Sequence, residues 1–171
     1  MSRKRIFVPG DLKRLEYRRE VRPSDRDDVR FVVESSGFFS AEEVDVAVEL
    51  VDERLRRGPA SGYEFLFAEL SGMILGYTCF GPIPCTVHSY DLYWIAVRED
   101  FRGLGIGQAL LAESEGVIAA LHGKRIYVET SSRAQYASTR RFYELCGYRK
   151  EAFLEDFYAP GDAKVIVVKT V

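Results

Sequence analysis

The spacing of apolar residues in the first third of the chain predicts a strand and two helices. Residues 15–22 alternate apolar and charged side chains, as a half-buried strand does. Valines at positions 29, 32 and 33 share one face of a helix expected over residues 25–34, where Ser24 and Asp27 have the spacing of a capping box. A second box, Ser40 with Glu43, opens a helix that ends at residues 56–57 before a Gly-Pro pair. The buried stripe of this second helix is expected to be Val44, Ala47, Val48 and Val51.

The remaining pattern continues the alternation of strands and helices. Strands are expected at 63–69, 73–80, 90–97, 125–130, 148–157 and 164–171, and helices at 108–121 and 137–146. The helix after residue 105 should bury Ile106, Leu110, Val117 and Leu121. The order β-α-α-β-β-β-α-β-α-β-β predicts one α/β domain with a mixed, mostly antiparallel central sheet of about seven strands and helices on both faces. We assign this domain to residues 15–171 and expect residues 1–14, which lack periodicity, to form a loose lead-in.

Composition and charge narrow the class of protein. The net charge of the 171 residues is −2, which gives no electrostatic case for a nucleic-acid partner. Three cysteines without Cys-x-x-Cys spacing argue for a reducing compartment and against a disulfide framework or a metal site. No apolar run approaches the ~18 residues that a membrane span needs. We therefore expect a cytoplasmic monomer or homodimer with no membrane partner and no metal.

Three glycines at every second position lie between the strand at 90–97 and the helix that follows. Gly103, Gly105 and Gly107 remove side chains where the N–H groups of a helix start lack partners, which favours binding of a phosphate. Gly107 precedes Gln-Ala rather than Lys-Ser/Thr, so the segment is not a Walker loop. The spacing also differs from the Gly-x-Gly-x-x-Gly fingerprint of dinucleotide sites. A tight strand-to-helix turn without a ligand is the alternative interpretation.

Two motifs resemble signatures of the GNAT superfamily of N-acetyltransferases. Residues 102–107, Arg-Gly-Leu-Gly-Ile-Gly, are similar to its Arg-x-x-Gly-x-Gly loop. Residues 142–148, Phe-Tyr-Glu-Leu-Cys-Gly-Tyr, are similar to the Phe-Tyr-Glu-x-x-Gly-Phe/Tyr signature of its last helix. The motifs stand in the family's order with a predicted strand between them. The resemblance implies the GNAT fold over residues 15–171 and acetyl-CoA as the cosubstrate.

The resemblance also implies where the cofactor binds. Backbone N–H groups of the glycine loop would hold the pyrophosphate, and residues 95–97 would pair with the pantetheine arm as an extra strand does. The family often has Asn seven residues before the signature tyrosine, whereas Tyr136 stands there in this chain. The residues expected to bind the cofactor are Ile95, Ala96, Val97, Arg102, Gly103, Leu104, Gly105, Ile106, Gly107, Gln108 and Tyr136.

The catalytic candidates are one tyrosine and two acids. By resemblance, Tyr143 is the general acid that protonates the thiolate; its alternative is a core aromatic. Asp91 is the candidate base because it precedes the predicted thioester-binding residues on their strand. Glu129, on the next strand, could hold the amine or activate it through water. For both acids, an ordinary solvated or ion-paired carboxylate is the alternative.

The segments expected to bound the acceptor are aromatic and acidic. Phe38, Tyr93 and Tyr158 are the candidate contacts, and rings with carboxylates suit a cationic amine. We expect an N-acetyltransferase that moves the acetyl group of acetyl-CoA to a primary amine by direct attack in a ternary complex. The expected acceptor is a small amine or amino acid, with a peptide amino terminus as the other candidate. The alternative function is a non-catalytic acyl-CoA sensor or regulatory module.

Overall fold

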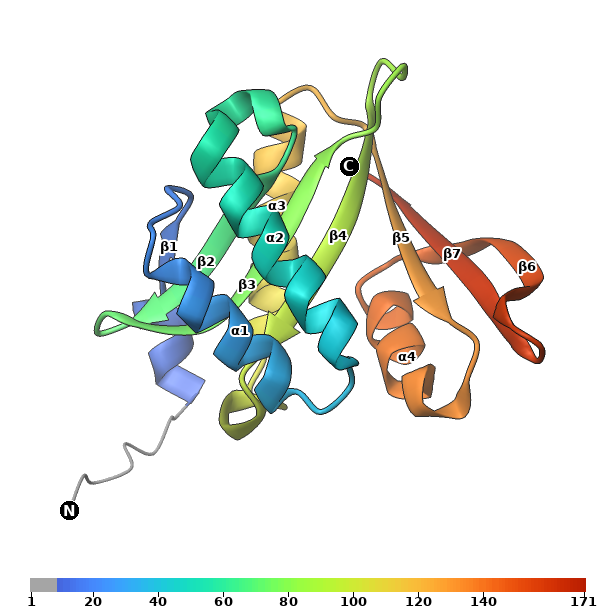
Figure 1. Ribbon diagram of the computed structural model, residues 1–171, viewed down its shortest axis with the longest axis horizontal. Coiled ribbons are helices and arrows are strands. Elements are labelled where there is room, and N and C mark those ends of the chain that lie inside the picture. The colour runs from blue at the N-terminus through green and yellow to red at the C-terminus, as the bar shows by residue number, and fades with distance from the viewer. Residues whose placement is uncertain (1–8) are drawn as a thin grey trace. The chain divides into compact units, whose positions relative to one another are not determined.

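The computed structural model describes residues 9–171 and contains a seven-stranded sheet in the order β1-β2-β3-β4-β5-β7-β6 (Figure 1). The predicted order of helices and strands is confirmed. Residues 1–8 of the expected lead-in lie outside the described part, and Pro9–Arg14 forms a 3-10 helix. The strands are β1 (Glu16–Arg18), β2 (Glu64–Leu70), β3 (Met73–Pro82), β4 (Ser89–Val97), β5 (Arg125–Ser131), β6 (Arg149–Ala159) and β7 (Asp162–Thr170). The α-helices are α1 (Asp25–Ser35), α2 (Ala41–Arg57), α3 (Ile106–Ala120) and α4 (Ala137–Leu145).

Within the described residues, one of two compact units comprises residues 9–79 together with Trp94–Glu113. In Figure 1 its helices α1 and α2 lie side by side across β2 and β3. The predicted valine stripes of both helices are buried there, against a stack of Phe65, Phe67 and Tyr77. The capping box of α2 is confirmed: the Glu43 N–H donates to Ser40 Oγ (3.2 Å), and the Ser40 N–H donates to Glu43 Oε2 (2.8 Å).

The other face of β3 in this unit is covered by the first half of α3. A Cβ placed on Gly76 would lie 2.7 Å from the Ala96 carbonyl oxygen and 3.0 Å from Leu110 Cδ1. Only glycine therefore lets the helix approach the strand this closely. Ile106 and Leu110 are buried as predicted, but Leu121 is 41% exposed because the helix ends one residue before it. The expectation for Leu121 is wrong.

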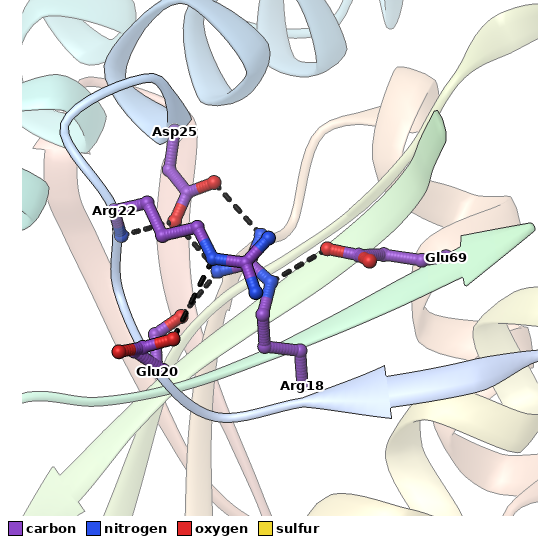
Figure 2. A network of polar contacts seen from close by, with 5 residues as sticks. All are labelled: Arg18, Glu20, Arg22, Asp25 and Glu69. Carbon is purple, nitrogen blue, oxygen red and sulfur yellow. Dashed lines mark hydrogen bonds and ion pairs between the residues drawn. The ribbon is translucent and has the colours of Figure 1, made fainter. Parts of the chain in front are cut away.

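The first strand is shorter than predicted because a buried charge network draws the chain away from the sheet (Figure 2). The Arg18 guanidinium donates two hydrogen bonds to Asp25 (2.9 and 2.8 Å) and one to Glu69 (2.6 Å). Asp25 also accepts from the Arg22 N–H (2.7 Å), so this carboxylate organises the start of α1. The predicted Ser24–Asp27 box is wrong, because Ser24 has helical backbone angles and makes no side-chain cap.

The second compact unit comprises Phe80–Tyr93 and Ser114–Val171. Its strand β5 pairs with the start of β4 in parallel, from Ser89–Arg125 to Asp91–Tyr127, and both strands continue beyond this register. On its other side β5 pairs antiparallel with β7 over its full length. The hairpin of β6 and β7 turns at Pro160-Gly161 as predicted, and its register shifts twice. β5 therefore lies between β4 and β7 in the sheet of this unit.

No helix within residues 9–171 combines the length and apolarity needed to cross a membrane.

Candidate active site

The glycine loop connects β4 to α3 through two glycines with left-handed backbone conformations. After β4 ends at Val97, the chain forms a short 3-10 turn and enters α3 at Ile106. Gly103 and Gly105 have φ of 72° and 87°, a left-handed conformation that costs other L-residues about 1–2 kcal/mol. Gly107 instead lies in the first turn of α3. The described first turn contains no acidic side chain, so its own sequence does not offset the positive end of the helix dipole.

Arg102, at the start of this loop, contacts the turn that follows α1. Its Nη2 donates to the Ser36 carbonyl oxygen (3.0 Å), and its guanidinium lies 4.8 Å from the centroid of the Phe38 ring. The structure therefore brings together Arg102, predicted to bind the cofactor, and Phe38, predicted to bind the acceptor. A phosphate contact of Arg102 stays a prediction.

Residues 95–97, which are expected to pair with pantetheine, lie on β4 after the last β4–β5 pair, Asp91 with Tyr127. Ala96 is buried, whereas Ile95 and Val97 are partly exposed. The Arg98 N–H donates to the Leu75 carbonyl oxygen (2.9 Å), which fixes the end of this segment. Asp91 and Tyr93 alternate with buried Tyr90 and Leu92, so they lie on the more open face of β4, as expected from the sequence.

A cluster of charged and aromatic side chains lies on the sheet of the second unit. Glu129 Oε2 accepts an ion-paired hydrogen bond from Lys164 Nζ at 2.6 Å. The same ammonium lies 3.7 Å from the Phe157 ring centroid and 5.9 Å from that of Tyr158. The Lys164 side chain is only 12% exposed. The combination of rings and acid that the sequence suggested for an acceptor cation therefore already holds a cation of the chain.

Lys164 is the functional candidate that the sequence reasoning missed. Its strand is rich in valine, and the local hairpin places it opposite Leu154 of β6. Its other neighbour comes from β5, where Ser131 stands opposite Lys164 and Glu129 opposite Ile166. Alternation along β7 would have put Lys164 and Ile166 on one face, but pairing with β5 is long-range and is not encoded in a local motif.

Asp91 has the electrostatic surroundings of a base. Burial raises the pKa of the half-buried Asp91 carboxyl, and the nearby negative charge of Glu129 raises that pKa further. Lys164 opposes this shift and lowers the Asp91 pKa. A raised carboxyl pKa brings the group closer to the operating pH of a general base. Glu129, by contrast, forms an ion pair with Lys164 (2.6 Å).

Tyr143 lies on α4 and is only 3% exposed. Its ring packs edge-on against Phe142 and Tyr148, with centroid distances of 5.2 and 5.4 Å. Burial raises the pKa of the Tyr143 hydroxyl, with a smaller contribution from Cys146. The phenol therefore keeps its proton at neutral pH, as a proton donor must. The structure places Tyr143 in the core, and its catalytic role stays a prediction.

The other predicted contacts are aromatic side chains at the edges of their elements. Tyr136 caps α4, and the Arg133 guanidinium lies 5.7 Å from its ring centroid. Arg133 also pairs with the buried Asp162 (3.0 Å). Tyr93 and Tyr158 are 38% and 48% exposed, so both present ring surface to solvent.

The comparisons with known proteins identify the family of the chain. Residues 61–150, just over half of the chain, match the model of the acetyltransferase (GNAT) domain family. A crystal structure of a protein assigned to the GNAT acetyltransferases, from Desulfovibrio desulfuricans, is 49% identical with a TM-score of 0.90, covering 91% of this chain and 98% of that one. The chain belongs to the GNAT family of acetyltransferases.

Two further relatives are more distant. An uncharacterized N-acetyltransferase of Methanocaldococcus jannaschii is 31% identical over 105 residues, which are 61% of this chain and 65% of that protein. The match therefore spans less than two thirds of that relative. An aminoglycoside 6′-N-acetyltransferase in complex with coenzyme A has a TM-score of 0.72 at 18% identity, covering 91% of this chain and 96% of that one. This last likeness concerns the fold.

Proposed function

We propose that the protein transfers an acetyl group from acetyl-CoA to a primary amine by direct attack in a ternary complex. The observation that carries the proposal is the left-handed glycine loop opening into a helix whose first turn has no acid of its own. Such a loop suits the pyrophosphate of acetyl-CoA, because backbone N–H groups and the helix dipole both favour an anion. Residues 95–97 are the proposed partners of the pantetheine amides.

The proposed chemistry uses Asp91 as the base and Tyr143 as the acid. The acceptor reaches the site as an ammonium ion and must lose a proton before it attacks. Asp91 takes that proton, the amine nitrogen bonds to the thioester carbon, and the carbon–sulfur bond breaks. The departing thiolate takes the phenolic proton of Tyr143, and the surplus proton that the amide nitrogen then loses restores the phenol. The raised pKa of Asp91 supports its role as the base, and the raised pKa of Tyr143 keeps its phenol protonated, which is the form that a donor needs.

The charge of the second-unit cluster narrows the acceptor. Asp91 and Glu129 carry two negative charges when ionised, and Lys164 carries one positive charge, so the cluster has a net charge of −1. Glu129 and the Phe157 ring are already engaged by Lys164. One singly charged amine at Asp91 would complete the balance, which supports a small amine or amino acid. Tyr93, Tyr158 and Phe38 are its proposed contacts, and a peptide amino terminus is the other candidate.

The test is a thiol-release assay of acetyl-CoA against a panel of amines, amino acids and peptides. With an accepted amine, Tyr143→Phe should bind acetyl-CoA normally and lose roughly tenfold or more in kcat, since general acids contribute at least that much. Tyr77→Phe is the matched control, because Tyr77 is also a fully buried tyrosine and belongs to the core of the other unit. Equal turnover of the two variants would remove Tyr143 from the mechanism. Tight acetyl-CoA binding with no thiol release from any amine would support the sensor instead.

A cytoplasmic location is part of the proposal. All three cysteines lie in the described part of the chain and are unpaired, and Cys85 is exposed. Exposed free thiols persist in reducing compartments.

A further inference from the structure

The turn between α1 and α2 is held by residues of the proposed cofactor segment. Helix α1 ends at Ser35, and Gly37 leaves the helix with a φ of 67°. The last carbonyl groups of a helix lack partners within it and favour a nearby cation. The described last turn of α1 contains no basic side chain that could supply one.

Arg102 supplies the missing cation from the glycine loop. Its guanidinium Nη2 donates to the Ser36 carbonyl oxygen (3.0 Å). Ser36 is only 7% exposed, so loss of this donor would leave a largely buried carbonyl poorly satisfied. The flat side of the same guanidinium lies over Phe38, with 4.8 Å to the ring centroid.

Two further contacts hold the same turn to β4 and its loop. The Glu99 N–H donates to Ser35 Oγ (3.4 Å), just before the turn. Phe39, just after Phe38, packs against Trp94 of β4 with 4.8 Å between ring centroids. The turn is thus fixed on both sides of Phe38. Movement of Arg102 to a phosphate would break the hydrogen bond to Ser36 and the stacking on Phe38 together.

We propose that Arg102 is a positioning residue for the acceptor, which holds the Ser36–Phe38 turn in place, and that it is not a ligand of the cofactor phosphates. The proposal rests on the proposed function, in which Phe38 contacts the acceptor. It assigns the phosphates to the loop backbone alone. It also explains an arginine here rather than a lysine, because only the planar guanidinium can donate to a carbonyl and stack on a ring at once.

The experiment compares Arg102→Ala and Arg102→Lys with Arg98→Ala. Arg98 is the matched control, because it lies in the same loop but stacks on Phe31 and Phe101 instead. Calorimetry measures acetyl-CoA affinity, and hydrogen exchange follows the amides of Gly37 and Phe38. These amides donate to the Glu34 carbonyl and to Ser36 Oγ (3.1 and 3.3 Å), so release of the turn exposes them.

Both Arg102 variants should speed exchange at Gly37 and Phe38 about fivefold or more, while acetyl-CoA affinity stays within about twofold. Arg98→Ala should leave the exchange of both amides unchanged. With an accepted amine, Arg102→Ala should raise the KM for the amine about fivefold and leave the KM for acetyl-CoA unchanged.

Two results would overturn the proposal. One is a loss of acetyl-CoA affinity of about tenfold or more in Arg102→Ala, the effect expected when a charged phosphate ligand is removed. The other is unchanged exchange at both amides. The failure of every amine to release thiol would instead contradict the proposed function, and it would leave the binding and exchange results to decide the role of Arg102.

Discussion

Substitution of Asp25 by Ala should destabilise the fold strongly, because it breaks a buried charge network (Figure 2). The Asp25 carboxylate is 1% exposed and accepts three hydrogen bonds, two from Arg18 and one from the Arg22 N–H. Without it, the Arg18 guanidinium, 11% exposed, keeps only its bonds to Glu69 and to the Glu20 carbonyl and its position over the Phe67 ring. The main cost is that Arg18 loses one of its two carboxylate partners close to the core.

The magnitude follows from the partners that remain. Removing one partner of a buried ion pair costs about 3–5 kcal/mol. Glu69 still balances Arg18, so the lower limit applies and we expect a loss of about 3 kcal/mol in the free energy of unfolding. For a chain of this size each kcal/mol lowers Tm by about 2–4 °C, which gives a decrease of roughly 6–12 °C.

Guanidinium chloride titration followed by circular dichroism measures the loss. The control is Asp45→Ala, which removes an exposed pair with Arg30 of similar length (3.0 Å) and should change stability by less than about 0.5 kcal/mol. Arg18 also pairs with the largely buried Glu69. The triple variant Arg18→Met/Asp25→Leu/Glu69→Met should therefore regain most of the stability, since it removes all three charges and leaves none of them buried. Equal effects of Asp25→Ala and Asp45→Ala, or no recovery in the triple variant, would refute this reasoning.

Three further substitutions test the site and its support. Lys164→Met removes the charge that lowers the Asp91 pKa, so the acidic limb of the kcat/KM profile should move to higher pH. The control Lys150→Met, which removes a lysine that lies over the Phe153 ring, should leave this limb in place. A limb that moves to lower pH in Lys164→Met would contradict the assignment of Asp91 as the base. Gly105→Ala forces a side chain into a backbone with a φ of 87° and places its Cβ 3.3 Å from Leu12. Calorimetry should then show acetyl-CoA binding weakened by roughly tenfold or more, while circular dichroism shows a folded chain. Unchanged affinity would argue against the loop as the phosphate site. Gly76→Ala should lower the free energy of unfolding by about 1–3 kcal/mol, because its Cβ would press on the Ala96 carbonyl oxygen. Gly116→Ala, with open space around its Cβ, should instead stabilise α3 by up to about 1 kcal/mol. Similar denaturation midpoints for the two variants would show that the close packing at Gly76 does not matter for stability.

The two predicted capping boxes show where sequence reasoning succeeds in this chain. Ser40 and Glu43 exchange both bonds of the box, because nothing else competes for these exposed side chains at the start of α2. At α1 the same spacing fails, since the buried Asp25 carboxylate takes over the start of the helix through Arg18 and Arg22. Local patterns predict helix ends reliably only where no long-range partner offers a stronger bond.

In the candidate site, too, local features could be predicted from the sequence and long-range contacts could not. The connection of a strand to a helix through the glycine loop is a local property that the sequence predicted, and the structure adds the left-handed conformation of Gly103 and Gly105. The partners of Arg102 and Glu129 are not local: Ser36 lies 66 residues before Arg102, and Lys164 faces Glu129 through the β5–β7 pairing. A sequence motif identifies which groups can bind an anion or a cation. It does not reveal which of them the fold has already paired.

This distinction changes the argument about the acceptor. From residue types alone, the aromatic and acidic segments suggested a site for a cationic amine. Because Lys164 already neutralises Glu129 and covers the Phe157 ring, the attraction left to the acceptor comes from Asp91. Asp91 is also the proposed base, so the group that attracts the ammonium would be the group that deprotonates it. An acceptor with one ammonium group and no further positive charge then meets both requirements, whereas a second positive charge would face Lys164.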